Sequence, residues 1–360
     1  MKVLGLAYYG SWAATTRVRL GQYQAPLRHL GVELEVRSLL GDWYRDGREE
    51  GSSARAFASP RVVAAVLGRF TDALAARQFD KVIVTREVLP FLPSFLERAC
   101  LGRRFIYDLD DANYLLYRMK GPTPRLPFMR NKIDGLIRHA EAVTAGSEAL
   151  ASYSRSINPA TTVLPSVVDT ERYEVRSREK RDHIVIGWIG SPATSKYLDA
   201  LVVPLAGIAS RAKIRFRVVG AKAPIIPGVE TESVRWSARE EVAHIQSFDI
   251  GVMPLHDDAW SRGKCAFKLI QCMACGVPVI ASPVGANNEV VTPDCGMLAR
   301  GDSEWLNALE VLVYDEALRF RMGQAGRDRV ERHYSLAVAA PKLAAVLGGV
   351  RDGLAQPIAR

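Results

Sequence analysis

The chain has 360 residues, which is too long for one ordinary domain and suits two domains of roughly 150–180 residues each. Hydrophobic residues make up 48% of it and charged residues 24%, so each half can bury a core and intrinsic disorder is excluded. The formal net charge of +9 favours anionic partners, namely nucleotide phosphates, nucleic acid or an acidic membrane surface, without choosing among them.

The sequence shows no sign of export or of membrane insertion. Five cysteines at irregular spacing argue against a disulfide framework and for a reducing compartment. Residues 1–12 contain too short an apolar run for a signal peptide, and no stretch approaches the ~20 apolar residues that a membrane span needs. We therefore predict a cytoplasmic protein.

Short apolar runs alternate with longer amphipathic segments through the first half, which is typical of βαβ units around a parallel sheet. The predicted strands of this half are Val3–Ala7, Glu33–Arg37, Lys81–Thr85, Arg104–Tyr107 and Ala142–Ala145. The predicted helices are Val18–Leu30, Pro60–Arg77 and Pro93–Ala99.

The segment Tyr173–His183 is highly charged and lacks apolar periodicity, so we predict a linker there. The alternation then restarts, with predicted strands at Ile184–Ile189, Ile214–Val219, Ile250–Met253 and Pro278–Ala281. The predicted helices of this half are Tyr197–Ser210, Glu240–Ser247, Phe267–Ala274, Glu304–Val313 and Glu316–His333. The pattern predicts an α/β protein with two doubly wound, Rossmann-like domains, over residues 1–172 and 184–340, and a cleft between them.

The loop after the first strand of the second half reads GSPATSK and has the composition of an anion site. Gly190 lets the backbone approach a ligand, Ser191, Thr194 or Ser195 can cap the next helix, and Lys196 adds a positive charge. An ordinary capped strand-to-helix turn is the alternative.

Two lysines stand at the start of a predicted helix further along. Lys264 and Lys268 are four residues apart, so they share a helix face at its positive end, where a bound diphosphate would relieve their repulsion. A solvated basic turn is the alternative. The loop after the next strand places Asn287, Asn288 and Glu289 where they can bind sugar hydroxyls or cap the following segment.

The first half offers candidate substrate-binding residues at the ends of its strands. Trp12, Arg17 and Arg19 follow the first strand, and Arg86 follows the third. Arginine suits the bidentate recognition of phosphate or of a polar acceptor, and a solvent-exposed arginine is the alternative in each case.

Tyr107–Asp111 (YDLDD) is the densest acidic cluster of the chain and follows a predicted strand. Its carboxylates Asp108, Asp110 and Asp111 repel one another, which favours an active-site role over a structural one. They can orient an acceptor hydroxyl, take its proton or stabilise positive charge on a sugar. Metal binding and helix capping are the alternatives.

Residues 118–138 interleave basic and apolar side chains. Arg118, Lys120, Arg125, Arg130, Lys132 and Arg138 stand against Asp134 alone, with Leu126, Phe128 and Met129 among them. This composition suits an interface with anionic lipid headgroups and a lipid-linked acceptor. A basic acceptor loop or a solvated face is an equal alternative.

Six motifs occur in the order that one enzyme family has. They are VTAGSEAL (Val143–Leu150), VLPSVVDTERY (Val163–Tyr173), GWIGSPAT (Gly187–Thr194), EEVAHIQSFD (Glu240–Asp249), DIGVMPL (Asp249–Leu255) and MACGVPVIASPVGANNEVV (Met273–Val291). Together they resemble the retaining GT-B glycosyltransferases called family 4, or glycosyl transferases group 1. The resemblance covers nearly the whole chain.

The resemblance implies a C-terminal domain that binds a UDP- or GDP-sugar, with no further cofactor or metal, and an N-terminal domain that binds a glycan or lipid-linked acceptor. It implies transfer with retention, in cell-surface polysaccharide or glycolipid synthesis, at the inner face of the membrane. It also implies that the C-terminal helix, within 341–360, packs back on the N-terminal domain.

The resemblance extends to single residues. Lys196 matches the basic residue used on the donor diphosphate, and Gln271 falls on the second glutamate of an E-x7-E pair, which contacts the ribose. Gly285 and Glu289 match the family's G-x-x-x-E loop.

Three positions depart from the family's pattern. Gly263 replaces the first glutamate of the pair, Ser191 replaces an arginine, and Asp110 stands where many members have a histidine. We expect Lys264 and Lys268 to supply the missing positive charge, as ligands of the donor with Gly190, Ser191, Asn287 and Asn288.

The expected catalytic groups are Lys196 and Lys268 on the leaving diphosphate, and Asp110 and Asp111 on the acceptor side. Two alternatives are a GT-B-shaped sugar-nucleotide epimerase and a non-enzymatic anion- or nucleic-acid-binding protein. The histidines form no obvious acid–base pair for an epimerase, and no motif for specific nucleic-acid recognition is present.

Overall fold

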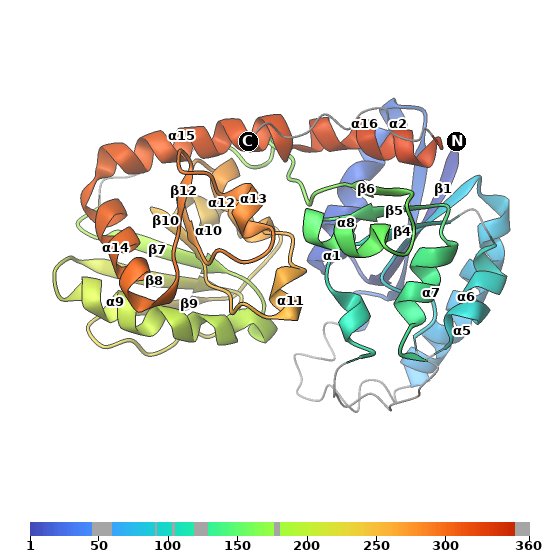
Figure 1. Ribbon diagram of the computed structural model, residues 1–360, viewed down its shortest axis with the longest axis horizontal. Helices are drawn as coiled ribbons and strands as arrows, with labels where there is room; N and C mark the ends of the chain where they lie inside the picture. The colour runs from blue at the N-terminus through green and yellow to red at the C-terminus, as the bar shows by residue number, and fades with distance from the viewer. Residues whose placement is uncertain (45–59, 91, 103–104, 119–128, 176–180, 350–360) are drawn as a thin grey trace. The chain divides into compact units, whose positions relative to one another are not determined.

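The computed structural model describes residues 1–44, 60–90, 92–102, 105–118, 129–175 and 181–349. The chain forms two compact units, each built on a six-stranded parallel sheet (Figure 1). Unit 1 comprises Met1–Ser166 and Ala339–Arg360, and unit 2 comprises Val167–Val338. The predicted fold class is confirmed.

The sheet of unit 1 has all its strands parallel. In spatial order they are β2 (Glu33–Leu40), β1 (Lys2–Tyr9), β3 (Lys81–Thr85), β4 (Phe105–Leu109), β5 (Ala142–Ala145) and β6 (Thr161–Val163). Its helices are α1 (Ala14–Arg19), α2 (Gln24–His29), α5 (Pro60–Ala75), α6 (Ser94–Leu101), α7 (Lys132–His139) and α8 (Glu148–Arg155), with short 3-10 turns η1 (Gly21–Tyr23), η2 (Ala76–Gln78) and η3 (Asn113–Leu115).

The predicted helix Val18–Leu30 is broken into α1, η1 and α2. Pro26 explains the break, because it donates no hydrogen bond and its ring would clash with the carbonyl of Gln22 in a continuous helix. Elements α7, α8 and β6 were not predicted from the sequence, and the predicted strand start at Arg104 lies outside the described residues.

The sheet of unit 2 is also parallel throughout. Its spatial order is β12 (Gly296–Leu298), β11 (Val279–Ala281), β10 (Ile250–Met253), β7 (Ile184–Ile189), β8 (Ile214–Val219) and β9 (Glu230–Val234). Its helices are η5 (Pro192–Leu201), α9 (Val202–Ala209), α10 (Glu241–Gln246), α11 (Ala259–Arg262), α12 (Phe267–Ala274), α13 (Asn287–Val290), α14 (Gly301–Tyr314) and α15 (Glu316–His333).

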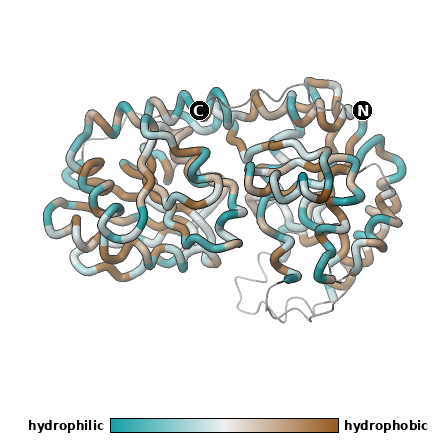
Figure 2. The backbone as a smooth tube through the Cα atoms, viewed as in Figure 1, coloured by the Kyte–Doolittle hydropathy of each residue, from teal (hydrophilic) through white to brown (hydrophobic). Residues whose placement is uncertain are grey.

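Both faces of the unit 2 sheet are covered, so its strands are hydrophobic on both sides. Along β7, Val185 and Ile189 pack into one core cluster and Ile186 and Trp188 into another, as the alternation of side chains in a strand requires. Hydrophobic residues accordingly recur along the strands of both units (Figure 2).

The first residue of the predicted linker, Tyr173, is part of a hydrophobic core. Tyr173 is buried in the core of unit 2, and its hydroxyl donates a 2.6 Å hydrogen bond to Glu241. Because charged residues surround Tyr173 in the sequence, its burial was not predicted. The division between the units falls at Ser166 and Val167, earlier than the predicted boundary after Arg172. Residues 176–180 of the linker lie outside the described residues.

Helix α16 (Leu336–Leu347) begins in unit 2, but its residues from Ala339 onward group with unit 1. Leu343 and Leu347 of this helix are fully buried. Unit 1 is therefore assembled from two stretches of chain that are separated in sequence by the whole of unit 2.

Candidate functional site

The carboxyl edge of the unit 2 sheet brings Gly190 and Lys268 together. Gly190 follows β7, and the Nζ atom of Lys268, on α12, lies 4.2 Å from the centroid of the Trp188 ring and 3.3 Å from Thr194 Oγ1. A Cβ atom on Gly190 would lie 2.5 Å from this Nζ atom, so glycine leaves the space that the ammonium group occupies. The predicted donor residues Gly190 and Lys268 are thus neighbours.

The loop after β11 lies against the end of α11, shortly before Lys264. Gly285 has a φ of 53°, and a Cβ atom there would lie 2.5 Å from the carbonyl oxygen of Arg262, at the end of α11. Gly263 and Lys264 follow Arg262 directly. The loops after β7, β10 and β11 therefore converge at one edge, where open α/β sheets bind ligands.

The backbone between the two lysines is strained. Ala266 precedes α12 with a φ of 51° and a ψ of 21°, a left-handed conformation that is uncommon for alanine. Strained residues persist where the surrounding structure holds them, and they cluster at ligand sites. Here the strain fixes the turn that presents Lys264 and Lys268.

Among the described residues, Lys268 has no carboxylate as an ion-pair partner. Burial and the nearby Lys264 lower the pKa of Lys268 to about 7. In the described parts of the chain no acidic side chain forms an ion pair with it, and the aromatic face of Trp188 and the hydroxyl of Thr194 are its neighbours. A bound anion would stabilise the charged form of this lysine and raise its pKa.

Two residues that were predicted to contact the donor have buried side chains that form hydrogen bonds within unit 2. The Nε2 atom of Gln271, which is 3% exposed, donates a 2.8 Å hydrogen bond to the hydroxyl of Tyr173. The Nδ2 atom of Asn287, 1% exposed, donates a 2.9 Å bond to the carbonyl oxygen of Ser282. Both amide nitrogens thus support the fold, and the contacts of Gln271 with the ribose and of Asn287 with sugar hydroxyls stay predictions.

The other predicted donor residues lie at the surface. Ser191, Lys196 and Asn288 are exposed and Glu289 is partly buried. The ammonium group of Lys196 lies 5.1 Å from the ring centroid of Tyr197. Lys268 contacts the Gly190 loop through Thr194.

The carboxyl edge of the unit 1 sheet carries a second strained residue, Arg86. It follows β3 with a φ of 71°, and the hydroxyl of Tyr107 donates a 2.6 Å hydrogen bond to its carbonyl oxygen. Its guanidinium carbon lies 4.6 Å and 5.4 Å from the ring centroids of Tyr8 and Tyr9. Arg86 is thus held against aromatic rings at the edge where the predicted acceptor residues gather.

Trp12 extends this aromatic group. Its ring centroid lies 5.3 Å from that of Tyr9, and its carbonyl oxygen accepts a 2.7 Å hydrogen bond from Arg17. The ring of Tyr44, after β2, lies 6.4 Å from Tyr9. Trp12, Arg17 and Arg86 were predicted from the sequence, whereas the tyrosines were not, because only their position after neighbouring strands could have indicated them.

Asp110 follows β4 at the same edge. Burial, followed by the repulsion of Asp108, raises the pKa of Asp110, whereas a hydrogen bond from Thr15 lowers it. A carboxyl group with a raised pKa is suited to accept a proton. Asp111 is partly buried, and its side chain accepts a 3.0 Å hydrogen bond from the backbone N–H of the adjacent residue, Ala112.

Arg19 and Asp108 are buried partners. Arg19 donates hydrogen bonds of 2.9 Å and 2.6 Å to the two carboxylate oxygens of Asp108, and both side chains are 1% exposed. Thr144 and the carbonyl oxygen of Leu164 complete the network. The pair ties α1 to β4 inside unit 1, and the substrate-binding roles of Arg19 and Asp108 stay predictions.

A second buried ionic cluster was not predicted. The ammonium group of Lys132 lies 2.7 Å from a carboxylate oxygen of Glu87 and 2.7 Å from one of Glu97, and Tyr117 donates a hydrogen bond to Glu87. Burial and the charge of Glu87 raise the pKa of Glu97 to about 7, against the opposing effect of Lys132. Burial is the largest cause of this shift, and the single lysine between two carboxylates does not offset it.

The segment 118–138 is therefore less basic at its surface than predicted. Lys132 is buried, and Arg118 forms an ion pair with Asp134. Arg130 and Arg138 are exposed, and residues 119–128, with Lys120, Arg125, Leu126 and Phe128, lie outside the described residues.

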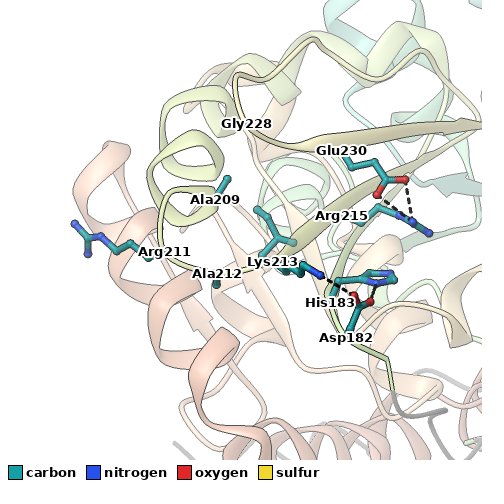
Figure 3. A pocket seen from close by; sticks show the side chains of 10 residues that line it. Asp182, His183, Ala209, Arg211, Ala212, Lys213, Arg215, Gly228 and Glu230 are labelled. Carbon is teal, nitrogen blue, oxygen red and sulfur yellow. Dashed lines mark hydrogen bonds and ion pairs between the residues drawn. The ribbon is translucent and has the colours of Figure 1, made fainter.

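A pocket of about 580 Å³ lies at the amino ends of β7, β8 and β9, at the opposite edge of the unit 2 sheet (Figure 3). Several of its charged side chains pair with one another. Lys213 and His183 contact Asp182 at 2.8 Å and 2.9 Å, and Arg215 contacts Glu230 at 2.8 Å. Because ligands of open α/β sheets bind at the carboxyl ends, this pocket is not part of the candidate site.

Over the described ranges, no three or more His, Cys, Asp or Glu side chains are grouped so that they could hold a metal ion. No helix in the described part of the chain has the length and apolar character to cross a membrane.

The chain matches a protein-family model over part of its length. The family described as glycosyl transferases group 1 matches residues 183–315, which cover most of unit 2 and less than half of the chain.

Curated proteins match over part of their length. A GDP-mannose-dependent monoacylated alpha-(1-6)-phosphatidylinositol monomannoside mannosyltransferase of Corynebacterium glutamicum is 38% identical over 80 residues, which are 22% of this chain and 21% of that protein. A D-inositol 3-phosphate glycosyltransferase of Stackebrandtia nassauensis is 25% identical over 222 residues, 52% of this chain and 48% of that protein. The chain thus matches less than half the length of these relatives.

Solved structures match over nearly the whole chain. Sucrose-phosphate synthase from Thermosynechococcus elongatus has a TM-score of 0.72 at 14% identity, over 97% of this chain and 99% of that one. Anabaena HepE in complex with UDP and glucose has a TM-score of 0.69 at 14% identity, over 97% and 100%. WaaG, a glycosyltransferase involved in lipopolysaccharide biosynthesis, has a TM-score of 0.66 at 14% identity, over 96% and 100%. The chain therefore has the GT-B fold, and its match to glycosyl transferases group 1 over residues 183–315 supports a transferase.

Proposed function

We propose that this protein is a retaining glycosyltransferase that moves a sugar from a UDP- or GDP-sugar to a hydroxyl group of a glycan or lipid-linked acceptor. Unit 2 binds the donor and unit 1 binds the acceptor. The product belongs to a cell-surface polysaccharide or glycolipid.

The observation that carries this proposal is the environment of Lys268. A lysine held between an aromatic ring, a threonine hydroxyl and a glycine turn, with a second lysine nearby, is poorly solvated and repelled. A diphosphate supplies the missing negative charge, and the Gly190 turn gives it access to backbone N–H groups. The match of residues 183–315 to glycosyl transferases group 1 supports a nucleotide-sugar as the source of that diphosphate.

In the proposed reaction the bond between the anomeric carbon and the diphosphate oxygen breaks, and a bond from that carbon to the acceptor oxygen forms. Positive charge develops on the sugar ring while negative charge grows on the diphosphate. Lys268 and Lys264 stabilise the leaving diphosphate, which lowers the barrier electrostatically.

On the acceptor side, Asp110 takes the proton of the attacking hydroxyl, consistent with its raised pKa. Arg86, Trp12 and Tyr9 bind the acceptor next to it, because aromatic rings pack on sugar or lipid and a guanidinium group binds hydroxyls or phosphate.

The donor class comes partly from the relatives. The mannosyltransferase of C. glutamicum is named as GDP-mannose-dependent, and the HepE structure holds UDP and glucose. These names support a nucleoside diphosphate for this chain and leave UDP and GDP to be distinguished by binding.

The test is a thermal-shift panel of UDP, GDP, ADP and their common sugar conjugates against the wild-type protein and Lys268→Ala. We expect one nucleotide to raise the unfolding temperature, and the variant to bind it roughly 10- to 100-fold more weakly, because a charge-assisted contact is lost. Lys213→Ala is the matched control, since Lys213 is exposed at the opposite edge of the same sheet. No stabilisation of folded wild-type protein by any nucleotide would overturn the proposal.

The stereochemistry is read from the product. Proton NMR of the new glycosidic linkage, with the donor that the panel identifies, should show the donor's own anomeric configuration. An inverted product would contradict retention while leaving the transferase activity in place.

A further inference from the structure

The guanidinium group of Arg86, at the carboxyl edge of the unit 1 sheet, has few partners. Arg86 is partly buried, and among the described residues its side chain makes one hydrogen bond, in which Nη1 donates to the hydroxyl of Tyr9 at 3.1 Å. Its Nε atom is buried and has no hydrogen-bond partner. In the parts of the chain that the structure describes, no acidic side chain forms an ion pair with it. A guanidinium group carries five N–H donors, so most of this set is unused.

Aromatic rings keep water from this cation without pairing it. The guanidinium carbon lies 4.6 Å from the ring centroid of Tyr8 and 5.4 Å from that of Tyr9. Such rings attract a cation over their faces, but they offer no acceptor to N–H groups, which form hydrogen bonds in the guanidinium plane. The edge of the guanidinium group is therefore the part that can take a ligand.

The nearest carboxylate in the sequence has other partners. Glu87 follows Arg86, but its carboxylate lies 2.7 Å from the ammonium group of Lys132 and accepts a hydrogen bond from Tyr117. Both contacts are buried inside unit 1, where a lost partner is costly to replace. Glu87 thus stays with Lys132 and leaves the charge of Arg86 to be matched from elsewhere.

The backbone holds Arg86 in place before any ligand binds. Its φ of 71° is uncommon for a residue with a side chain, and the hydroxyl of Tyr107 fixes its carbonyl oxygen at 2.6 Å. Three residues further on, Lys132 donates a 2.6 Å hydrogen bond to the carbonyl oxygen of Leu89. A strained residue that its surroundings hold this firmly is typical of a binding site, and a preorganised cation loses little entropy on binding.

Arg86 also lies within electrostatic reach of Asp110. Burial is the main cause of the raised pKa of Asp110, and the positive charge of Arg86 is one of the influences that oppose it. An anion bound to Arg86 would cancel that influence and raise the pKa of Asp110 further. The carboxylate proposed to take the acceptor proton would then become a stronger base when the acceptor is in place.

These features select a class of acceptor. A neutral hydroxyl group would leave the desolvated charge of Arg86 unmatched, whereas a group with two oxygens and a negative charge fits its N–H edge. We propose that the acceptor carries such a group, a phosphate or a carboxylate, and that Arg86 binds it beside Asp110. This inference rests on the proposed function, because it deepens the acceptor role of unit 1.

The test is a titration of the full-length protein, followed by saturation-transfer NMR, with glucose, mannose and galactose. Each hexose is used as the neutral sugar, as its primary phosphate ester and as its uronate, so that phosphate and carboxylate are distinguished. We expect at least one charged form to bind roughly 10- to 100-fold more tightly than its neutral sugar, as a charge-assisted contact does. Arg86→Gln should abolish this preference.

Three further variants support the assignment. Arg28→Gln is the matched control, since Arg28 is an exposed arginine on α2 of the same unit, and it should keep the preference. Lys268→Ala should keep it too, because its cation belongs to the donor site of unit 2. Arg86→Lys retains the charge without the planar fork, so its preference should fall between those of the wild-type protein and Arg86→Gln.

Equal binding of charged and neutral hexoses by the wild-type protein would overturn the inference. So would a preference that survives Arg86→Gln, or one that Lys268→Ala abolishes, which would assign the anion to the donor site. Because the wild-type comparison needs no variant, a failure of Arg86→Gln to fold does not protect the inference.

This inference and the proposed function fail separately. Stabilisation by a nucleotide, with no preference for charged hexoses, would overturn the anionic acceptor and leave the transferase in place. A preference that depends on Arg86, in a protein that no nucleotide stabilises, would keep the anion site and overturn the transferase.

Discussion

At the scale of single residues, Lys268 makes donor binding sensitive to pH. Its pKa of about 7 in the free protein lies far below the ordinary value for lysine, and a bound diphosphate raises it. Binding above pH 7 therefore requires the uptake of a proton. We predict that the dissociation constant of the nucleotide increases up to about tenfold per pH unit between pH 7 and 9, which isothermal titration calorimetry measures.

Lys268→Arg is the matched variant for this prediction. Arginine stays charged throughout the range, so its nucleotide affinity should be nearly independent of pH even if the contact geometry weakens it. Equal pH dependence in the wild-type protein and in Lys268→Arg would show that another group titrates.

The sequence could predict that some residues lie close together, because the carboxyl ends of parallel strands and the helices that follow them meet at one edge. Gly190 and Lys268 were both assigned to the donor, and they are neighbours. The pair of Arg19 and Asp108 could not be predicted, because its members are 89 positions apart and only the fold joins them. The partners of Lys132 could not be predicted either, because they are also distant in sequence. Lys132 was therefore counted as a surface charge.

At the scale of elements, the loop after β11 depends on one glycine. Gly285→Ala would place a Cβ atom 2.5 Å from the carbonyl oxygen of Arg262 and force the loop away from Gly263 and Lys264. We predict weaker nucleotide binding together with a loss of about 1–2 kcal/mol of unfolding free energy, from the left-handed backbone.

Gly301→Ala separates the two effects. Gly301 has a similar φ of 61°, but no atom lies within 4 Å of the position of its Cβ. This variant should lose comparable stability in a denaturant titration and keep its nucleotide affinity. If both variants bound nucleotide equally well, the contact with Arg262 would have no role in the site.

The strands were predictable to different degrees for a physical reason. Central strands of a parallel sheet are buried on both faces and read as continuous apolar runs, as in β7. The missed strands β6, β9 and β12 are short or lie at sheet edges. In β9 the residues are ETESV, whose polar side chains resemble a loop.

At the scale of the whole molecule, unit 1 depends on helix α16. Leu343→Ala should cost about 2–5 kcal/mol, because it leaves a cavity at a side chain that is 1% exposed. Hydrogen exchange should show faster exchange in unit 1 and not in unit 2.

Leu309→Ala provides the reciprocal experiment, since Leu309 is fully buried in α14 of unit 2. Its effect should be confined to unit 2. Loss of protection in unit 2 after Leu343→Ala would contradict the assignment of α16 to the core of unit 1.

The discontinuity of unit 1 has a consequence for protein synthesis. A ribosome releases residues 1–166 first and then the whole of unit 2 before Leu343 and Leu347 emerge. Unit 2 is continuous in sequence, so it can complete its core during translation. In residues 1–166, by contrast, the surface that packs against α16 stays uncovered until α16 has been synthesised. In the cell, the segment that is synthesised first therefore completes its folding last, and we expect chaperones to bind it during that interval.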